Sequence, residues 1–251
     1  MMLAGGVLTV TLADEANRNA LSSQLLADLL GAIDRAEGDD AVRVIVLTNR
    51  GHIFSAGADL RERSGDDPPG TVDMATVFGR IVHSPKPFVG RIAGHAIAGG
   101  LGLAASLDIS IAAEDAKFGF TEVRLGVAPA IISVICLPKM RRADAAAAFL
   151  QGNRLEASEA AQLGLINAAV PPGELDARVA DVVADLLLGG PNALAAAKQL
   201  LARVPTMEFT AALEWASDLS ASLFAGAEGR EGMSAYLEKR SPSWVLPDEA
   251  S

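Results

Sequence analysis

The chain has 251 residues, half of them hydrophobic, and carries a formal net charge of −10. Such an acidic chain has no broad basic surface to neutralise phosphates, which excludes nucleic acid as the expected partner and favours a small molecule. The single cysteine, Cys136, excludes a disulfide framework and a cysteine-rich metal site, and it indicates a reducing, cytoplasmic compartment. The longest apolar stretch, residues 88–107, is interrupted by Arg91 and His95, so we expect no membrane span.

The first part of the chain alternates strands with helices. Residues 6–14 alternate with period two and end in turn-forming residues, which predicts a strand. Residues 22–36 place leucines on one helical face, with Ser22 or Ser23 as the N-cap. The β-branched run 42–49 is typical of a strand that is buried on both faces. The order strand, helix, strand favours a right-handed crossover and an α/β fold.

The rest of the chain divides into a core and a helical tail. The polar residues 61–71, rich in Gly and Pro, predict an exposed loop, and a helix follows as far as His83. Further strands are expected at 86–92, 108–113 and 164–170, and helices at 192–204, 207–225 and 228–240. We therefore predict one core over residues 1–190 and a helical region over residues 191–251.

The segment GHAIAGGLGLA, residues 94–104, places four glycines in an otherwise apolar stretch. An interior glycine costs about 1 kcal/mol of helix stability relative to alanine, so these glycines need another explanation. The segment lacks the Gly-Lys-Ser/Thr ending of a phosphate-binding loop. Gly100, Gly102 and Ala105 match a dinucleotide-binding fingerprint with Glu122 further on, but the preceding loop is too long and the helix too short.

A third interpretation uses the backbone of this segment. A strand that turns into a helix at Gly99 leaves N–H groups unpaired at the helix start, where they favour negative charge, and glycine lets a substrate oxygen approach them. Residues 55–60, SAGADL, predict a second turn of this kind that enters another helix. Two backbone donors from two such turns suit an oxyanion hole.

Five segments of the chain occur in the order known from one protein family. They are NRNAL (17–21), FSAGADL (54–60), KPFVGRIAGHAIAGGLGLAASLDI (86–109), FGFTEVRLGVAPA (118–130) and EGMSAYLEKRSPSW (231–244). Together they cover nearly the whole chain, which resembles the crotonase, or enoyl-CoA hydratase/isomerase, superfamily. The resemblance implies a crotonase-like spiral of ββα units with a C-terminal helical trimerisation region. It also implies an acyl-CoA thioester as the partner, with coenzyme A as part of the substrate and no separate cofactor.

The resemblance assigns the binding residues by motif position. The backbone N–H groups of Ala58 and Gly99 are the expected oxyanion donors for the thioester oxygen. The expected substrate-binding residues are Ala56, Asp59, Leu60, Arg61 and Gly100. We also expect Asp59 to cap the helix that follows it, and Gly100 to allow close packing behind Gly99.

Glu122 is the expected general acid and base. It stands where hydratases of the family keep their second glutamate, whereas Gly102 stands where they keep the first. Phe118, Phe120 and Val123 surround it in the sequence, and partial burial raises a carboxyl pKa toward a useful range. The expected activity is hydration of a short or branched 2-enoyl-CoA. An enoyl-CoA isomerase needs no more than one base and is the alternative, and a non-catalytic acyl-CoA-binding homologue is the alternative of another class.

The remaining polar residues are assigned no chemistry. His52, His83 and His95 are too scattered for a metal site, so we expect no metal. Ser55 lacks the G-x-S-x-G context of a nucleophile. In the family the C-terminal helices support trimers, often paired into hexamers, so a homotrimer or homohexamer is expected. Arg240, near the end of the last helix, is either a solvated charge or a contact to a CoA phosphate.

Overall fold

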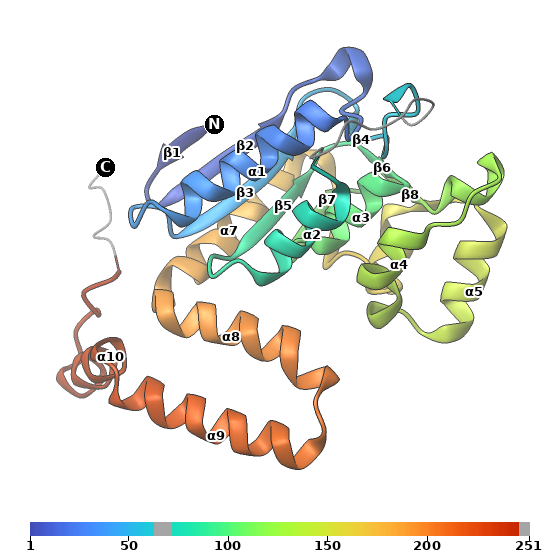
Figure 1. Ribbon diagram of the computed structural model, residues 1–251. Helices are drawn as coiled ribbons and strands as arrows, with labels where there is room; N and C mark the ends of the chain where they lie inside the picture. The colour runs from blue at the N-terminus through green and yellow to red at the C-terminus, as the bar shows by residue number, and fades with distance from the viewer. Residues whose placement is uncertain (63–71, 246–251) are drawn as a thin grey trace.

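The computed structural model describes residues 1–62 and 72–245, in which helices cover two β-sheets and a helical arm extends from them (Figure 1). The predicted loop 61–71 lies outside the described residues from position 63 onward. The prediction of an α/β fold is confirmed.

The larger sheet has six strands in the order β1-β2-β3-β5-β7-β10. Their bounds are Met2–Ala4, Val7–Leu12, Val44–Asn49, Phe88–Ile92, Ile109–Ala113 and Ala168–Val170. β1 is antiparallel to β2, and all the other neighbours are parallel. Parallel neighbours need crossover connections, which here pass through helices or through the second sheet.

The smaller sheet has four strands in the order β4-β6-β8-β9. Their bounds are Ile53–Ser55, His95–Ile97, Lys117–Gly119 and Arg154–Glu156. Successive strands therefore alternate between the sheets: β3 is followed by β4, β5 by β6 and β7 by β8. The helices α2 (Met74–His83) and α3 (Gly99–Ser106) follow β4 and β6. This alternation is the predicted spiral of ββα units.

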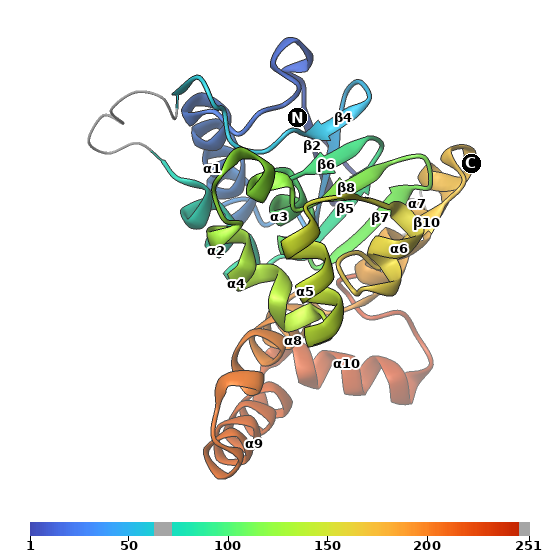
Figure 2. The ribbon, with the colours of Figure 1, turned by 90° about the vertical axis from the view of Figure 1, so that its right-hand side faces the viewer.

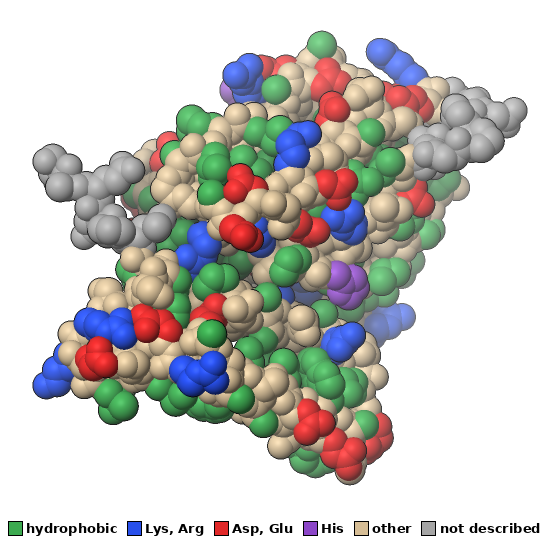
Figure 3. Space-filling model, turned by 60° about the vertical axis from the view of Figure 1, so that its left-hand side comes forward, with side chains coloured by type: hydrophobic (Ala, Val, Ile, Leu, Met, Phe, Trp, Pro, Cys, Tyr) green, Lys and Arg blue, Asp and Glu red, His purple; other side chains and the backbone are tan. Residues whose placement is uncertain are grey.

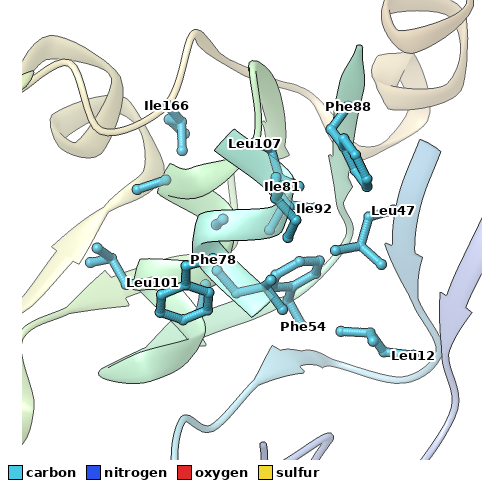
Figure 4. Close-up of a cluster of buried hydrophobic side chains, with 14 of the residues drawn as sticks. Leu12, Leu47, Phe54, Phe78, Ile81, Phe88, Ile92, Leu101, Leu107 and Ile166 are labelled. Atoms are coloured by element: carbon cyan, nitrogen blue, oxygen red, sulfur yellow. The ribbon is translucent and has the colours of Figure 1, made fainter. Parts of the chain in front are cut away.

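Strand β3 lies at the centre of two hydrophobic layers, and all six of its residues are buried. Val44 and Val46 face α7 (Leu175–Leu188), which covers one side of the large sheet. Ile45 and Leu47 face the opposite layer, where α1 (Ser23–Glu37), α2 and α3 pack. Figure 4 shows this second layer closing around Phe54, Phe78 and Leu101. Burial on both faces explains why the sequence of this strand is continuously apolar.

Three further helices flank the small sheet. They are α4 (Ala130–Cys136), α5 (Arg142–Gln151) and α6 (Ala157–Gln162). α4 packs on α3, and α5 packs on the short 3-10 helix Thr121–Leu125 (Figure 2). This arrangement brings the segment that carries Glu122 next to the glycine-rich helix.

The C-terminal arm consists of α8 (Pro191–Arg203), α9 (Phe209–Ala225) and α10 (Ala227–Glu238). α8 is tied to the core by the buried Lys198, whose ammonium donates to the Asp108 carboxylate and to the carbonyls of Ile81 and Lys86. α9 packs on α8 and α10 and leaves many hydrophobic side chains exposed. Figure 3 shows such side chains along the lower edge of the molecule, where the arm lies.

A hydrogen-bonded clamp centred on Arg43 and Trp244 holds the chain after α10 against the core. The Arg43 guanidinium donates to the carbonyl oxygens of Trp244 and Gly189 at 2.8 and 2.7 Å. The Trp244 indole N–H donates in turn to the carbonyl of Leu188 at 3.0 Å. Residues far apart in the sequence thus fix the junction between α7 and α8.

One predicted element differs in the structure, and another continues outside the described residues. After Asp59 the chain turns at Leu60 and Arg61, Glu62 has 3-10 helical geometry, and residues 63–71 are not described. Asp59 Oδ1 accepts from Arg61 N at 2.9 Å, and the expectation that Asp59 caps the helix after it stays a prediction. The predicted strand 164–170 is reduced to Ala168–Val170, because Gly164 adopts a positive φ of +81° in the turn after α6.

Within residues 1–62 and 72–245 no single helix is long and apolar enough to span a membrane. The neighbouring segments Pro172–Leu188 and Pro191–Thr206 meet that length and composition only as a pair, which is bent by 108°.

Candidate active site

Two backbone turns of the small sheet meet in the middle of the molecule. One follows β4 at Gly57 and Ala58, and the other joins β6 to α3 at Ala98 and Gly99. Gly57 adopts φ +85°, and a Cβ on it would lie 2.9 Å from both the Gly99 nitrogen and the Ile97 oxygen. Only glycine allows this backbone conformation and this approach at low cost. The two candidate oxyanion donors, Ala58 and Gly99, therefore lie on touching segments.

The N–H groups of these two residues are available to a ligand. Among the hydrogen bonds of residues 1–62 and 72–245, neither N–H donates to a protein acceptor. Gly99 is the first residue of α3, where N–H groups have no partner within the helix. The Gly57 carbonyl accepts from Leu21 N at 2.7 Å, and Ala98 N donates to Gly119 at 2.8 Å. These bonds fix both turns while leaving the two donors free.

The glycines of α3 reflect close contacts on different sides of the helix. A Cβ on Gly99 would lie 2.8 Å from the Met74 sulfur, and a Cβ on Gly100 would lie 2.2 Å from the Ser55 carbonyl oxygen. Such distances are far inside van der Waals contact. Gly99 therefore faces the site, and Gly100 packs behind it, as expected from the sequence.

A cleft of about 690 Å³ opens in front of the two turns. Of the predicted site residues, those that line it are Ala56, Ala58, Asp59, Leu60, Arg61, Gly99 and Glu122. Gly100, which we assigned to substrate binding, does not line the cleft, because it lies against Ser55. The size of the cleft is typical of a site for one small-molecule ligand.

Glu122 brings an unpaired carboxylate oxygen to this cleft. It lies in the 3-10 helix Thr121–Leu125, and its Oε2 atom is buried without a hydrogen-bond partner among the described residues. Burial raises the pKa of the Glu122 carboxyl, and a hydrogen bond from its own backbone N–H lowers it to a smaller extent. A buried carboxyl without a partner is suited to exchanging protons with a ligand.

Asp59 also lines the cleft, but both of its carboxylate oxygens are occupied. Asn17 Nδ2 donates to Oδ2 at 2.6 Å, and the backbone N–H of Arg61 donates to Oδ1 at 2.9 Å. These hydrogen bonds hold the pKa of Asp59 below its usual value. Asp59 thus fixes the turn that presents Ala58, which leaves Glu122 as the carboxyl suited to proton transfer.

The side of the cleft formed by the small sheet carries His95 and Arg154. The His95 Nδ1 atom accepts from Lys117 N at 3.1 Å, so its Nε2 atom carries the proton in the neutral ring. Burial and the nearby Arg154 lower the pKa of His95. Arg154 has no local signal in the sequence, because only the pairing of β8 with β9 brings it here, whereas Thr121, which also lines the cleft, directly precedes Glu122.

The side chains that we excluded from catalysis have other roles. Ser55 is fully buried, and its hydroxyl accepts from Gly57 N at 3.2 Å. Cys136 is buried, which raises the pKa of its thiol to about 12. Arg240 binds Glu231 and Glu238 and does not line the cleft. In the described part of the chain no three His, Cys, Asp or Glu side chains are grouped as metal ligands.

The fold and the cleft define an α/β protein of the crotonase type, in which strands alternate between two sheets and two free backbone donors share a cleft with one free carboxylate. Comparison with known proteins supports this assignment. The sequence profile of the family described as "Enoyl-CoA hydratase/isomerase" matches residues 3–246. The chain belongs to this enoyl-CoA hydratase/isomerase family.

Individual relatives are similar over nearly their whole length. The crystal structure of an enoyl-CoA hydratase from Mycobacterium avium is 41% identical, with a TM-score of 0.72 over 96% of this chain and 94% of that one. That of an enoyl-CoA hydratase from Mycobacterium smegmatis is 30% identical, with a TM-score of 0.89 over 96% of both chains. The 2,3-dehydroadipyl-CoA hydratase of Escherichia coli is 31% identical over 95% of this chain and 94% of its own. These names are those of enzymes, which favours an enzyme over a non-catalytic binding protein.

Proposed function

We propose that the protein adds water across the 2,3-double bond of a short or branched acyl-CoA thioester. The observation that carries this proposal is the Glu122 carboxylate, which is buried and unpaired in the same cleft as the free N–H groups of Ala58 and Gly99. Among the described residues that line the cleft, no other carboxylate has a free oxygen.

The geometry supports a two-step addition. The thioester oxygen accepts from the N–H groups of Ala58 and Gly99, which stabilise it as negative charge develops. Glu122 takes a proton from water while the hydroxyl bonds to Cβ, and the electrons of the double bond move to the thioester oxygen. The Glu122 carboxyl then returns its proton to Cα as the enolate collapses, so that one water is consumed and Glu122 is regenerated.

A second candidate activity uses the same residues. With one free carboxylate, Glu122 can also remove a proton from one carbon of a bound 3-enoyl-CoA and return it to another, which moves the double bond. The absence of a side chain at Gly102 favours this candidate, since no second acid or base reaches the cleft from that position.

Steady-state assays on the full chain test both activities. We would supply 2-butenoyl-CoA, 3-methyl-2-butenoyl-CoA, 2,3-dehydroadipyl-CoA and a 3-enoyl-CoA, and follow each product by chromatography. Glu122→Gln is expected to lower kcat by about 100-fold or more, because it removes the acid and base. Glu174→Gln, at an exposed glutamate outside the cleft, is the matched control and keeps full activity. Full activity of Glu122→Gln contradicts the site, and turnover of none of these thioesters contradicts the function.

We also propose that the protein assembles as a trimer or a hexamer through its helical arm. Phe209, Leu213, Tyr236 and Leu237 are 73%, 57%, 84% and 78% exposed in the single chain. Large apolar side chains gathered on one part of a chain favour burial against another subunit. Light scattering coupled to size-exclusion chromatography is expected to give three or six times the mass of one chain, and a monomer at micromolar concentration would contradict the assembly.

A further inference from the structure

One wall of the cleft that holds Glu122 includes an isoleucine from α4. Ile132 lines the cleft and is only 2% exposed. Glu122 lines the same cleft. Ile132 and Glu122 are therefore parts of one site.

Ile132 also occupies the space into which residue 102 would point. A Cβ on Gly102 would lie 2.3 Å from the Ile132 Cγ2 atom and 3.0 Å from its Cβ atom. The ring of Phe78 closes another side of this space, at 3.1 Å. Any side chain on α3 at this position thus overlaps with Ile132. The glycine and the isoleucine form a matched pair, in which α4 fills a volume that α3 leaves empty.

We propose that Ile132 determines the reaction outcome, by setting the ratio of water addition to double-bond migration. This proposal rests on the proposed function of the cleft. The branched apolar side chain gives this wall no hydrogen-bond donor or acceptor that could hold a water molecule near Cβ. Glu122 alone then has to position the water, so water addition is slower relative to double-bond migration than it would be with a polar side chain at position 132.

On a 3-enoyl thioester the two reactions follow one another, and each has its own first proton transfer. In migration, Glu122 removes a proton from Cα of a 3-enoyl thioester, the electrons form a dienolate at the thioester oxygen, and the Glu122 carboxyl protonates Cγ. In hydration of the resulting 2-enoyl thioester, water supplies both the hydroxyl for Cβ and the proton for Cα. Apart from the water that hydration consumes, neither reaction needs a further reactant. The ratio of hydration to migration therefore depends on the polarity and volume of the cleft that holds Glu122.

The chemical test compares the two products in one reaction. A 3-enoyl-CoA is supplied to the full chain, and the 2-enoyl and 3-hydroxyacyl products are separated and quantified. Ile132→Ala admits water by removing bulk, and Ile132→Thr keeps the branch at Cβ while adding a hydroxyl. Ile132→Thr is expected to raise the ratio of hydration to migration about fivefold, the value of one hydrogen bond to the attacking water. Ile132→Ala adds no hydrogen bond and is expected to raise the ratio less. Val134→Ala, on the exposed side of the same helix, is the control and leaves the ratio unchanged.

The packing test is independent of activity. Gly102→Ala is expected to lower Tm strongly in the native background and only weakly in the Ile132→Ala background, because the two positions share one volume. Equal losses in both backgrounds, or an unchanged product ratio in both active Ile132 variants, overturn the proposal while leaving the proposed function intact. A native protein that forms neither product overturns both.

Discussion

The residue before the second oxyanion donor is held in a strained conformation, and relieving the strain should change stability and activity in opposite directions. Ala98 has φ +52° and ψ −123°, the angles of a type II′ turn position that glycine normally fills. Such strain in a residue with a side chain costs about 1–3 kcal/mol. Ala98→Gly removes it but adds about 0.5–1 kcal/mol of backbone entropy loss. We expect a net gain in the free energy of unfolding of about 1 kcal/mol, from the difference of these terms.

Urea unfolding and Tm measurements check this expectation. For a chain of this length the gain corresponds to a rise in Tm of about 2–4 °C. We expect kcat to fall, because a glycine at position 98 lets the Gly99 N–H move away from the thioester oxygen. The matched control is Ala147→Gly, at an exposed position of α5 with ordinary helical geometry, which should lower stability by about 1 kcal/mol. If Ala98→Gly destabilises the protein as much as Ala147→Gly does, the backbone strain at Ala98 is refuted.

Three further predictions concern Glu122, the Lys198–Asp108 pair and Gly100. In Glu122→Gln the acidic limb of the pH–rate profile should disappear. The folded-state pKa of Glu122 is raised, so the contribution of this carboxyl to stability is lost as the pH rises through that pKa, and above it the variant should have a higher Tm than the native protein. An unchanged Tm at such a pH would contradict burial of the carboxyl. Lys198→Met should lower the free energy of unfolding by about 3 kcal/mol, because Asp108 loses its ion-pair partner and keeps only the hydrogen bond from Phe88 N. Asp108→Asn should recover part of this loss in the double variant, and a loss below about 0.5 kcal/mol refutes the role of the pair. Gly100→Ala should lower the free energy of unfolding in urea by about 3 kcal/mol, because the new Cβ would overlap with the Ser55 carbonyl, which cannot move away. Gly79→Ala has open space around its Cβ and should raise the free energy of unfolding by about 1 kcal/mol.

The sequence predicts the elements whose signals are local. The strand at 44–49 and the helix at 23–37 follow from an apolar run and from an amphipathic pattern behind Ser22, whose hydroxyl accepts from Leu25 N. The conformation of the SAGADL segment is fixed in part by residues that are distant in the sequence. Leu21 N donates to the Gly57 carbonyl and Asn17 donates to the Asp59 carboxylate, and the local sequence shows neither contact.

The site is likewise predictable only where its residues belong to a local sequence motif. Glu122, Ala58 and Gly99 come from motifs carried by the resemblance, and they line one cleft. The sequence shows that position 102 is a glycine where the family has a carboxylate. It does not show that Ile132 occupies the space of that side chain, because Ile132 is thirty positions away in an ordinary apolar stretch. Arg154 reaches the cleft only because β9 pairs with β8, and strands of three residues are too short to give a recognisable sequence pattern.

The clamp made by Arg43 and Trp244 bears on how the chain reaches its folded state. Its partners are 201 positions apart, so it closes a loop that includes nearly every element of both sheets. Contacts of such long range form late, because the entropy of closing the loop is lost before the contact forms. We therefore expect both sheets to form before the clamp closes, so that docking of the chain after α10 is a late step of folding.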